Sequence, residues 1–167
     1  MNKILPIAFV FLFISCAQNS DELNQLKADK EYVENNVEMY VSVWESTFSE
    51  KNIELITSEN FHDDVTVVTA SGDITGLEDL KAYYANYING FSDAEFSVIN
   101  AFGQGDKLVK QWNFKGTHDG EFFGIPATNK SLDLSGTTIV KMKDGKVLQE
   151  EDFFDNYSFM KQLGLIE

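Results

Sequence analysis

The chain has 167 residues, of which 43% are hydrophobic and 13% aromatic, and its formal net charge is −14. This composition is typical of a folded globular domain and excludes an intrinsically disordered chain. All 13 basic residues are lysines, so the chain lacks the basic surface of a nucleic-acid-binding protein, and we expect no nucleic-acid partner. A single cysteine excludes an intramolecular disulfide.

The first 16 residues, MNKILPIAFVFLFISC, predict an export signal. An apolar run from Ile4 to Ile14 follows a basic start and is short for a membrane span. A small residue directly before the lone Cys16 resembles a bacterial lipobox, which implies cleavage before Cys16 and a lipid on its sulfur. The alternative is an ordinary signal peptide in which the cysteine is incidental.

This N-terminal pattern divides the chain into three parts. We expect a signal peptide over residues 1–15, a polar tether over residues 16–30 and one domain over residues 31–167. The mature protein is then expected to be an exported bacterial lipoprotein on the cell envelope, at the outer membrane or the cell surface. Because the chain is strongly acidic, membrane attachment would depend on the lipid at Cys16 and not on charge.

Helical periodicity dominates the first half of the predicted domain. Apolar residues recur every three or four positions over residues 31–50, which predicts an amphipathic helix. A short second helix is predicted over residues 50–60, and a third over residues 76–91, with Gly90 near its end. Between them, residues 61–76 alternate around an SGD turn and predict a strand or hairpin.

Strand patterns fill the second half. Two strands are predicted around the GQGD turn within residues 94–118, and two or three more around the KDGK turn within residues 130–155. The remaining residues predict a short helical or irregular end. Helices followed by antiparallel strands predict an α+β domain with a bent sheet packed against the helices.

Most standard catalytic motifs are absent from the sequence. It has no GxSxG elbow, no phosphate-binding loop and no histidine or cysteine spacing typical of a metal site, so we expect no metal and no cofactor. Two strands instead carry polar residues among aromatic ones. Alternation places the following residues on one face of the first strand: Lys110, Trp112, Phe114, Gly116 and His118. It places a second set on one face of the other: Val147, Gln149, Glu151, Phe153 and Asp155.

These faces make Asp155 and His118 candidate site residues. If the strands line a cavity, desolvation would raise the pKa of Asp155 and make it a proton carrier near neutral pH. The alternative is that both residues lie at strand ends in water. Glu150 and Asp152 fall on the opposite face in this interpretation, where they would form an acidic edge that blunts sheet pairing.

An ordered set of motifs runs from residue 116 to residue 164. It consists of GTH-x-G-x-F-x-G-x-P at residues 116–126, the DGK turn at residues 144–146, Asp155, and QLG at residues 162–164. This set is similar to the C-terminal half of the SnoaL-like polyketide cyclases, and the similarity covers roughly residues 35–165. The sequence departs from the family pattern in PATNK, in the acidic EED before Phe153, and in having no arginine.

The resemblance implies a fold and a set of roles. The fold is the cone-shaped α+β barrel of the nuclear transport factor 2-like superfamily, in which a strongly curved antiparallel sheet wraps around about three N-terminal helices and encloses an apolar pocket. Asp155 matches the acid/base aspartate of the cyclases, and His118 would position the substrate. The residues expected to bind the substrate are Trp112, Phe114, Phe123, Phe153 and Tyr84.

Two functions remain open from the sequence. One is cofactor-free acid/base catalysis, of the cyclase, isomerase or hydrolase type, on a small hydrophobic carbonyl compound. The other is an envelope lipoprotein that binds a small hydrophobic ligand without converting it. A third hypothesis is an interaction role, in which the open sheet face pairs either with a second copy, giving a homodimer, or with another envelope protein.

Overall fold

A computed structural model of the chain describes residues 10–69 and 72–167, and of residues 10–19 only the course of the backbone. The predicted signal peptide lies largely outside this part, and so does the side chain of Cys16. The elements in chain order are α1 (Val10–Ser49), the 3-10 helix η1 (Ile53–Leu55), β1 (Phe61–Val68), β2 (Ile74–Thr75), α2 (Leu77–Gly90), β3 (Glu95–Gln104), β4 (Lys107–Thr117), β5 (Ser131–Lys143), β6 (Lys146–Phe154) and α3 (Asn156–Gln162).

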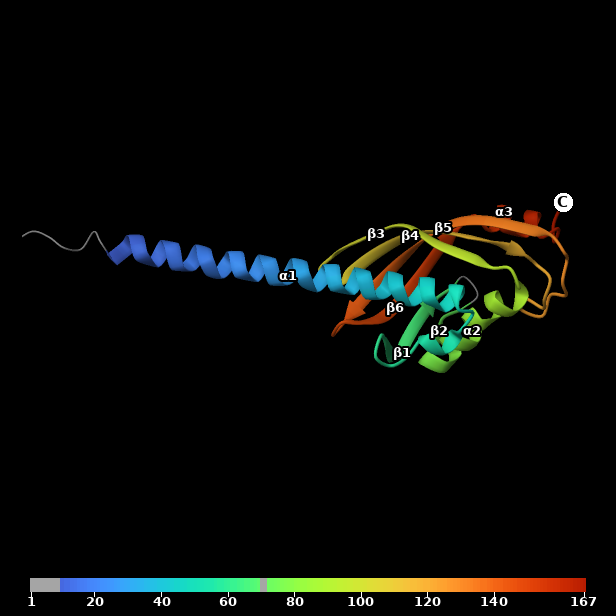
Figure 1. The fold of residues 1–167 in the computed structure, drawn as a ribbon, viewed down its shortest axis with the longest axis horizontal. Coiled ribbons are helices and arrows are strands. Elements are labelled where there is room, and N and C mark those ends of the chain that lie inside the picture. Colours follow the sequence, from blue (N-terminus) through green and yellow to red (C-terminus); the bar gives the residue numbers. More distant parts are fainter. Residues whose placement is uncertain (1–9, 70–71) are drawn as a thin grey trace, which may run out of the picture.

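The helix α1 is longer than the predicted amphipathic helix. Its C-terminal half packs on the domain through Tyr40, Trp44 and Phe48, which are spaced four residues apart and are all buried. The N-terminal part of α1 projects away from the domain in Figure 1, and residues 20–32 are all exposed. The segment predicted as a polar tether is therefore helical. Among the helices in the described part of the chain, none combines the length and hydropathy needed to cross a membrane.

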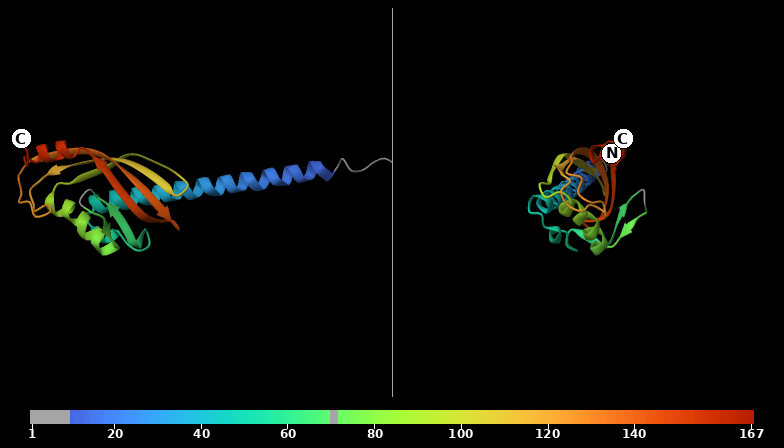
Figure 2. Two further views of the ribbon diagram at one scale, coloured as in Figure 1. Left: turned by 180° about the vertical axis from the view of Figure 1, so that it is seen from behind. Right: turned by 90° about the vertical axis from the view of Figure 1, so that its right-hand side faces the viewer.

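The strands form one six-stranded sheet in the order β2-β1-β6-β5-β4-β3. The strands bend around the helices, as the end-on view in Figure 2 shows. The predicted α+β class with a curved sheet is thus confirmed. One pairing departs from the predicted antiparallel sheet, because β1 pairs with β6 in parallel. These two strands are far apart in the sequence, and local alternation does not reveal the direction in which distant strands pair.

Three other predicted elements differ in extent. The predicted second helix, over residues 50–60, is reduced to the single 3-10 turn η1. The predicted hairpin of residues 61–76 is present as β1 and β2, which pair through only two residues of each strand. The third predicted helix is confirmed as α2, and the C-terminal residues form α3.

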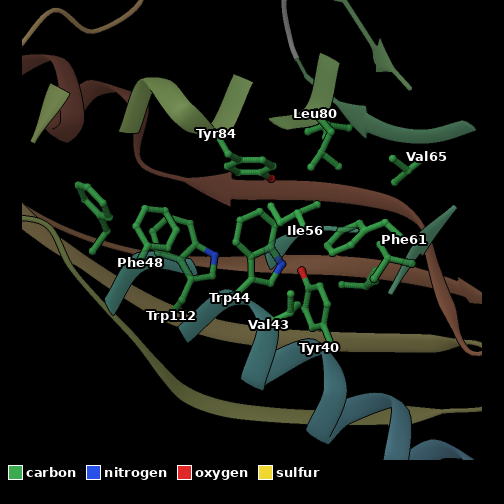
Figure 3. Close-up of a cluster of buried hydrophobic side chains, with 14 of the residues drawn as sticks. Tyr40, Val43, Trp44, Phe48, Ile56, Phe61, Val65, Leu80, Tyr84 and Trp112 are labelled. Atoms are coloured by element: carbon green, nitrogen blue, oxygen red, sulfur yellow. The ribbon is translucent and has the colours of Figure 1, made fainter. Parts of the chain in front are cut away.

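The core lies between the inner face of the sheet and the helices α1 and α2. Tyr40 and Trp44 enter it from α1, whereas Tyr84 and Leu80 enter it from α2 (Figure 3). Trp44 contacts the Tyr84 ring with a centroid distance of 4.4 Å, so the two helices meet through aromatic side chains. This aromatic core accounts for much of the phenylalanine, tyrosine and tryptophan content of the chain.

A β-bulge in β6 decides which residues face this core. On β5, Lys141 pairs with Gln149 while the next residue, Met142, pairs with Val147, so Leu148 is an extra residue in β6. Because side chains alternate along a strand, one extra residue reverses the faces beyond it. Val147 faces the core before the bulge, and Glu150 does so after it.

Candidate active site

Three neighbouring strands place a polar row on the inner face of the sheet. Lys110 on β4 pairs with Thr138 on β5, and Thr138 pairs with Asp152 on β6. The next row toward the end of β6 consists of Trp112, Gly136 and Phe154. Adjacent strands are about 4.8 Å apart, so Lys110 and Asp152 stand on either side of Thr138 and their side chains project into the same interior.

Gly136 makes room for the indole of Trp112. A Cβ atom at position 136 would lie 2.3 Å from Cζ2 of Trp112, so only glycine allows this close approach. The indole Nε1 then donates a hydrogen bond of 3.0 Å to Oγ1 of Thr138. The Thr138 hydroxyl in turn donates to Oδ1 of Asp152. This chain of hydrogen bonds fixes the orientation of the Asp152 carboxylate.

Glu150 lies deeper, behind this row, and is fully buried. Its Oε1 accepts hydrogen bonds from the Tyr40 hydroxyl and, at 3.0 Å, from Nε1 of Trp44. The hydroxyl of Tyr84 lies between the two carboxyl groups, 3.0 Å from Oδ2 of Asp152 and 3.4 Å from Oε2 of Glu150. A tyrosine hydroxyl both donates and accepts, so Tyr84 can connect the two acids.

Burial determines the protonation behaviour of this cluster. Desolvation raises the pKa of Glu150 to about 7, although the positive charge of Lys110 acts in the opposite direction. Desolvation also raises the pKa of Tyr40 and Tyr84 well above their ordinary value, so both hydroxyls stay protonated and serve as hydrogen-bond donors. At neutral pH, Glu150 is therefore close to the midpoint of its titration and can both take up and release a proton.

An aromatic cavity opens in front of Asp152 and Lys110. It has a volume of about 40 Å³, which suffices for a few water molecules. The residues that line it are Trp44, Phe48, Tyr84, Tyr87, Phe96, Lys110, Trp112, Phe114, Leu134, Asp152 and Phe154. Asp152 is the one carboxylate of this lining, and Glu150 lies outside it. The cavity is therefore apolar except at the row formed by Lys110 and Asp152 and at the Tyr84 hydroxyl.

A wider surface groove adjoins this cavity. The groove has a volume of about 860 Å³ and shares two lining residues with the cavity, Asp152 and Phe154. Tyr83 and Phe123 also line the groove, and their rings are in contact at a centroid distance of 5.1 Å. A compound in the groove can therefore also reach Asp152.

The predicted substrate-binding residues divide between these two spaces. Trp112, Phe114 and Tyr84 line the cavity. Phe123 and Phe153 line the outer groove instead, with 43% and 48% of their surface exposed. The predicted common face of β4, from Lys110 to the buried His118, is confirmed, with Gly116 half-buried between them.

The predicted face of β6 is wrong because of the bulge at Leu148. Glu150 is buried and Asp152 lines the cavity, so neither belongs to a solvent-facing acidic edge. Asp155, which alternation had placed in the site, is exposed and caps the N-terminus of α3, where Oδ1 accepts a hydrogen bond from the Ser158 backbone N–H. Asp155 belongs to neither the cavity nor the groove lining.

His118 is also outside the cavity lining, at the end of β4. It is fully buried against the rings of Phe91 and Phe122, and its Nδ1 lies 3.1 Å from Oγ1 of Thr128. Its backbone N–H and C=O pair with Lys130 and Asn129, which close the loop over residues 119–130. In this structure His118 holds the loop and does not meet Asp155.

Sequence reasoning missed the pair formed by Glu150 and the α1 side chains that donate to it. Tyr40 and Trp44 were identified as core residues from their spacing, but each carries a polar group that requires a partner when it is buried. That requirement predicts an acceptor opposite α1, which is Glu150. In the described part of the chain, no cluster of histidine, cysteine and acidic side chains is arranged to hold a metal ion.

Comparison with known proteins places this geometry in a family context. The chain matches the family model of SnoaL-like polyketide cyclases over residues 34–163. A structure assigned to the SnoaL-like polyketide cyclases from Jannaschia sp. CCS1 is 23% identical in sequence and has a TM-score of 0.69. The alignment covers 81% of this chain and 95% of the Jannaschia chain. No curated protein sequence matches the chain significantly.

Two further structures are similar at comparable levels. TsrD from Streptomyces laurentii is 20% identical, with 78% of this chain and 96% of TsrD covered and a TM-score of 0.70. A structure assigned to the polyketide cyclases from Bacillus cereus ATCC 10987 is 25% identical, with 75% and 78% covered and a TM-score of 0.61. These similarities support the nuclear transport factor 2-like fold.

Proposed function

Because the chain belongs to the SnoaL-like polyketide cyclase family, we propose that it catalyses cofactor-free proton transfer on a small hydrophobic carbonyl compound. The observation that supports this most strongly is the placement of Asp152. Its carboxylate lines an aromatic cavity and shares the Tyr84 hydroxyl with the fully buried Glu150. This arrangement combines a proton acceptor at the substrate with a second acid behind it.

In this proposal, Asp152 removes a proton from the carbon next to the carbonyl group. The proton then passes through the Tyr84 hydroxyl to Glu150, whose pKa of about 7 suits an exchange of protons near neutral pH. Lys110 lines the same cavity, where its Nζ can donate a hydrogen bond to the carbonyl oxygen. The aromatic walls exclude water, which strengthens each of these electrostatic interactions.

The small volume of the cavity limits the size of the reacting group. About 40 Å³ is far less than the 300–1,000 Å³ of a pocket for a drug-sized ligand. We therefore propose that only the reacting carbonyl end of the substrate enters the cavity, while the rest lies in the adjoining groove against Phe123 and Phe153. Phe123 and Phe153, both of which the sequence predicts to bind the substrate, then contact it from the groove.

Exchange of α-protons in D₂O tests the proposal without knowledge of the natural substrate. The folded protein is incubated with small apolar ketones, such as cyclohexanone, and the loss of the α-proton signal is followed by NMR. We expect exchange by the wild type, and a rate at least about 100-fold lower for Asp152→Asn, since general base catalysis contributes roughly 10²–10⁴-fold.

Asp155→Asn is the matched control, because asparagine also caps helix N-termini and keeps α3 in place. We expect this variant to exchange protons at the wild-type rate. Equal rates for Asp152→Asn and the wild type would contradict the role of Asp152. Ketones that stabilise the wild type against heat without exchanging would favour the non-catalytic ligand-binding function.

We also propose that the protein is a lipid-anchored envelope protein. The support is the lipobox-like sequence at Cys16 together with the exposed helical segment between Cys16 and the domain. Such a segment would hold the domain away from a membrane while leaving the groove accessible.

A further inference from the structure

Lys110 is a buried lysine whose amine makes no direct ion pair among the described residues. Only 4% of its surface is exposed, and it lies on β4, between β5 and the edge strand β3. Its Nζ stands over the rings of Tyr40 at 4.6 Å, Trp44 at 4.8 Å and Phe96 at 5.2 Å. Among the residues that the structure describes, none forms an ion pair or a hydrogen bond with this Nζ.

The surroundings of Lys110 differ from those of the exposed lysines. An ammonium group has three N–H donors, and aromatic faces attract its charge without replacing the hydrogen bonds lost on burial. The titratable groups that face it are Glu150 and Asp152 from β6, Tyr40 from α1 and Tyr84 from α2. Desolvation lowers the pKa of the Lys110 amine, and the two carboxyl groups only partly oppose this.

The position of the amine relative to Asp152 is equally specific. Both line the same cavity, and both project from the row in which Thr138 separates them. Two strand spacings, or about 10 Å, separate their backbones. Because both side chains line this cavity, a carbonyl compound bound there by Nζ would have its neighbouring carbon within the cavity that Asp152 also lines.

We propose that Lys110 forms an imine with the carbonyl group of the substrate, which is then an aldehyde or a ketone and not an ester or a carboxylic acid. This inference rests on the proposed function and names the substrate class of the same cavity. Nζ must be an unprotonated amine to attack, and its burial among three rings favours that form.

The amine of Lys110, the carbonyl group and a carboxylic acid supply every atom and proton of this step. The lone pair of Nζ forms a bond to the carbonyl carbon, and the carbonyl oxygen receives one proton from the nitrogen and one from a carboxylic acid. The oxygen then leaves as water, and a C=N bond to Lys110 remains. The protonated imine withdraws electrons from the neighbouring carbon, so Asp152 removes the α-proton from it more readily than from the free carbonyl compound.

Reductive trapping tests the imine directly. The full folded chain is treated at pH 6.5 for short times with propanal and sodium cyanoborohydride, which reduces an imine to a stable alkyl-lysine. Peptide mass spectrometry then gives the rate for each lysine. We expect Lys110 to be alkylated at least 10-fold faster than Lys115, which lies on the same strand and is exposed.

Two variants make the result specific. Lys110→Arg keeps the positive charge but cannot form an imine, and it should lose the fast alkylation while Lys115 continues to react. Asp152→Asn should retain alkylation of Lys110, since the amine is intact. Alkylation of Lys110 at the rate of Lys115 or below it, including none at all, would overturn the proposal.

The test also separates this inference from the proposed function. If Lys110 is not trapped while the wild type exchanges ketone protons and Asp152→Asn does not, the imine is refuted while proton transfer by Asp152 stands. If Lys110 is trapped but Asp152→Asn exchanges protons like the wild type, Lys110 is confirmed and the role of Asp152 fails. Circular dichroism of each variant verifies that the fold is retained.

Discussion

At Glu150, burial and hydrogen bonding act on the carboxyl group in opposite directions. Removal from water favours the protonated acid, whereas the hydrogen bonds from Tyr40 and Trp44 favour the carboxylate. Desolvation is the larger effect, so the folded protein holds a proton on Glu150 at pH values where the unfolded chain has released it. The stability of the protein must then depend on pH.

The free energy of unfolding should fall as the pH rises through this window. The pKa of Glu150 is about 7 in the fold and 4.5 in its absence, so between these values the folded state binds more protons than the unfolded state. Glu150 makes its full contribution to the free energy of unfolding below about pH 4.5. As the pH rises from there to 7, this contribution falls by about 3 kcal/mol. Glu150→Gln should not show this loss.

Urea unfolding of both proteins between pH 4.5 and pH 7.5 measures this difference. Glu151→Gln, a change at the next residue of β6, is the control and should follow the wild type. If the wild type and Glu150→Gln retained the same difference in stability at every pH, the raised pKa of Glu150 would be contradicted. The variant keeps an acceptor for Tyr40, so we expect it to fold.

At the scale of elements, the shape of the cavity depends on the close contact between β4 and β5 at Gly136. Gly136→Ala would place a methyl group against the Trp112 indole, 2.3 Å from Cζ2, and the ring would have to move away from Thr138. We expect a loss of about 1–3 kcal/mol in the free energy of unfolding, as for other overpacked sites, together with slower exchange of ketone protons.

Urea unfolding and the D₂O exchange assay check this expectation. Ser135→Ala, one residue earlier on β5, alters an exposed side chain and should change stability by no more than about 0.5 kcal/mol. If Gly136→Ala were as stable and as active as Ser135→Ala, the indole would not need the space that glycine provides.

Strands β4 and β6 show how far alternation predicts a site. On β4 the pattern runs without interruption, so the inward position of Trp112 and Phe114 followed from the sequence. On β6 the bulge at Leu148 reverses the pattern, and it brings Asp152 inward in place of Asp155. A bulge depends on how β6 pairs with β5, and the spacing of residues within β6 carries no record of it.

Turns were predicted more reliably because their signals are local. The DGK turn is present between β5 and β6, where Asp144 and Gly145 adopt φ angles of 51° and 76°. This left-handed backbone is the reason why such dipeptides mark hairpins. The parallel pairing of β1 with β6 and the meeting of Glu150 with α1 depend on contacts between distant residues, so they appeared only in the structure.

At the scale of the whole molecule, the two ends of α1 have different roles. Its C-terminal half contributes Tyr40 and Trp44 to the acid cluster, and residues 20–32, which are exposed, lie between the domain and Cys16. Contact with the sheet is established by Tyr32, whose hydroxyl accepts a hydrogen bond from the Gly145 N–H. The 16 helical steps from Cys16 to Tyr32, at 1.5 Å each, give a spacer of about 24 Å. The predicted homodimer through the sheet face stays a prediction.

A lipid on Cys16 would make this spacer a membrane stalk, and expression in a bacterium that processes lipoproteins tests it. We expect the full-length protein to incorporate a labelled fatty acid and to sediment with membranes until detergent is added. Cys16→Ser should lose the label and appear in the soluble envelope fraction, because a negatively charged chain gains nothing from anionic lipid headgroups. Asn24→Ala, on the exposed part of α1, should behave like the wild type. An unlabelled wild-type protein that is soluble without detergent would instead identify an ordinary signal peptide.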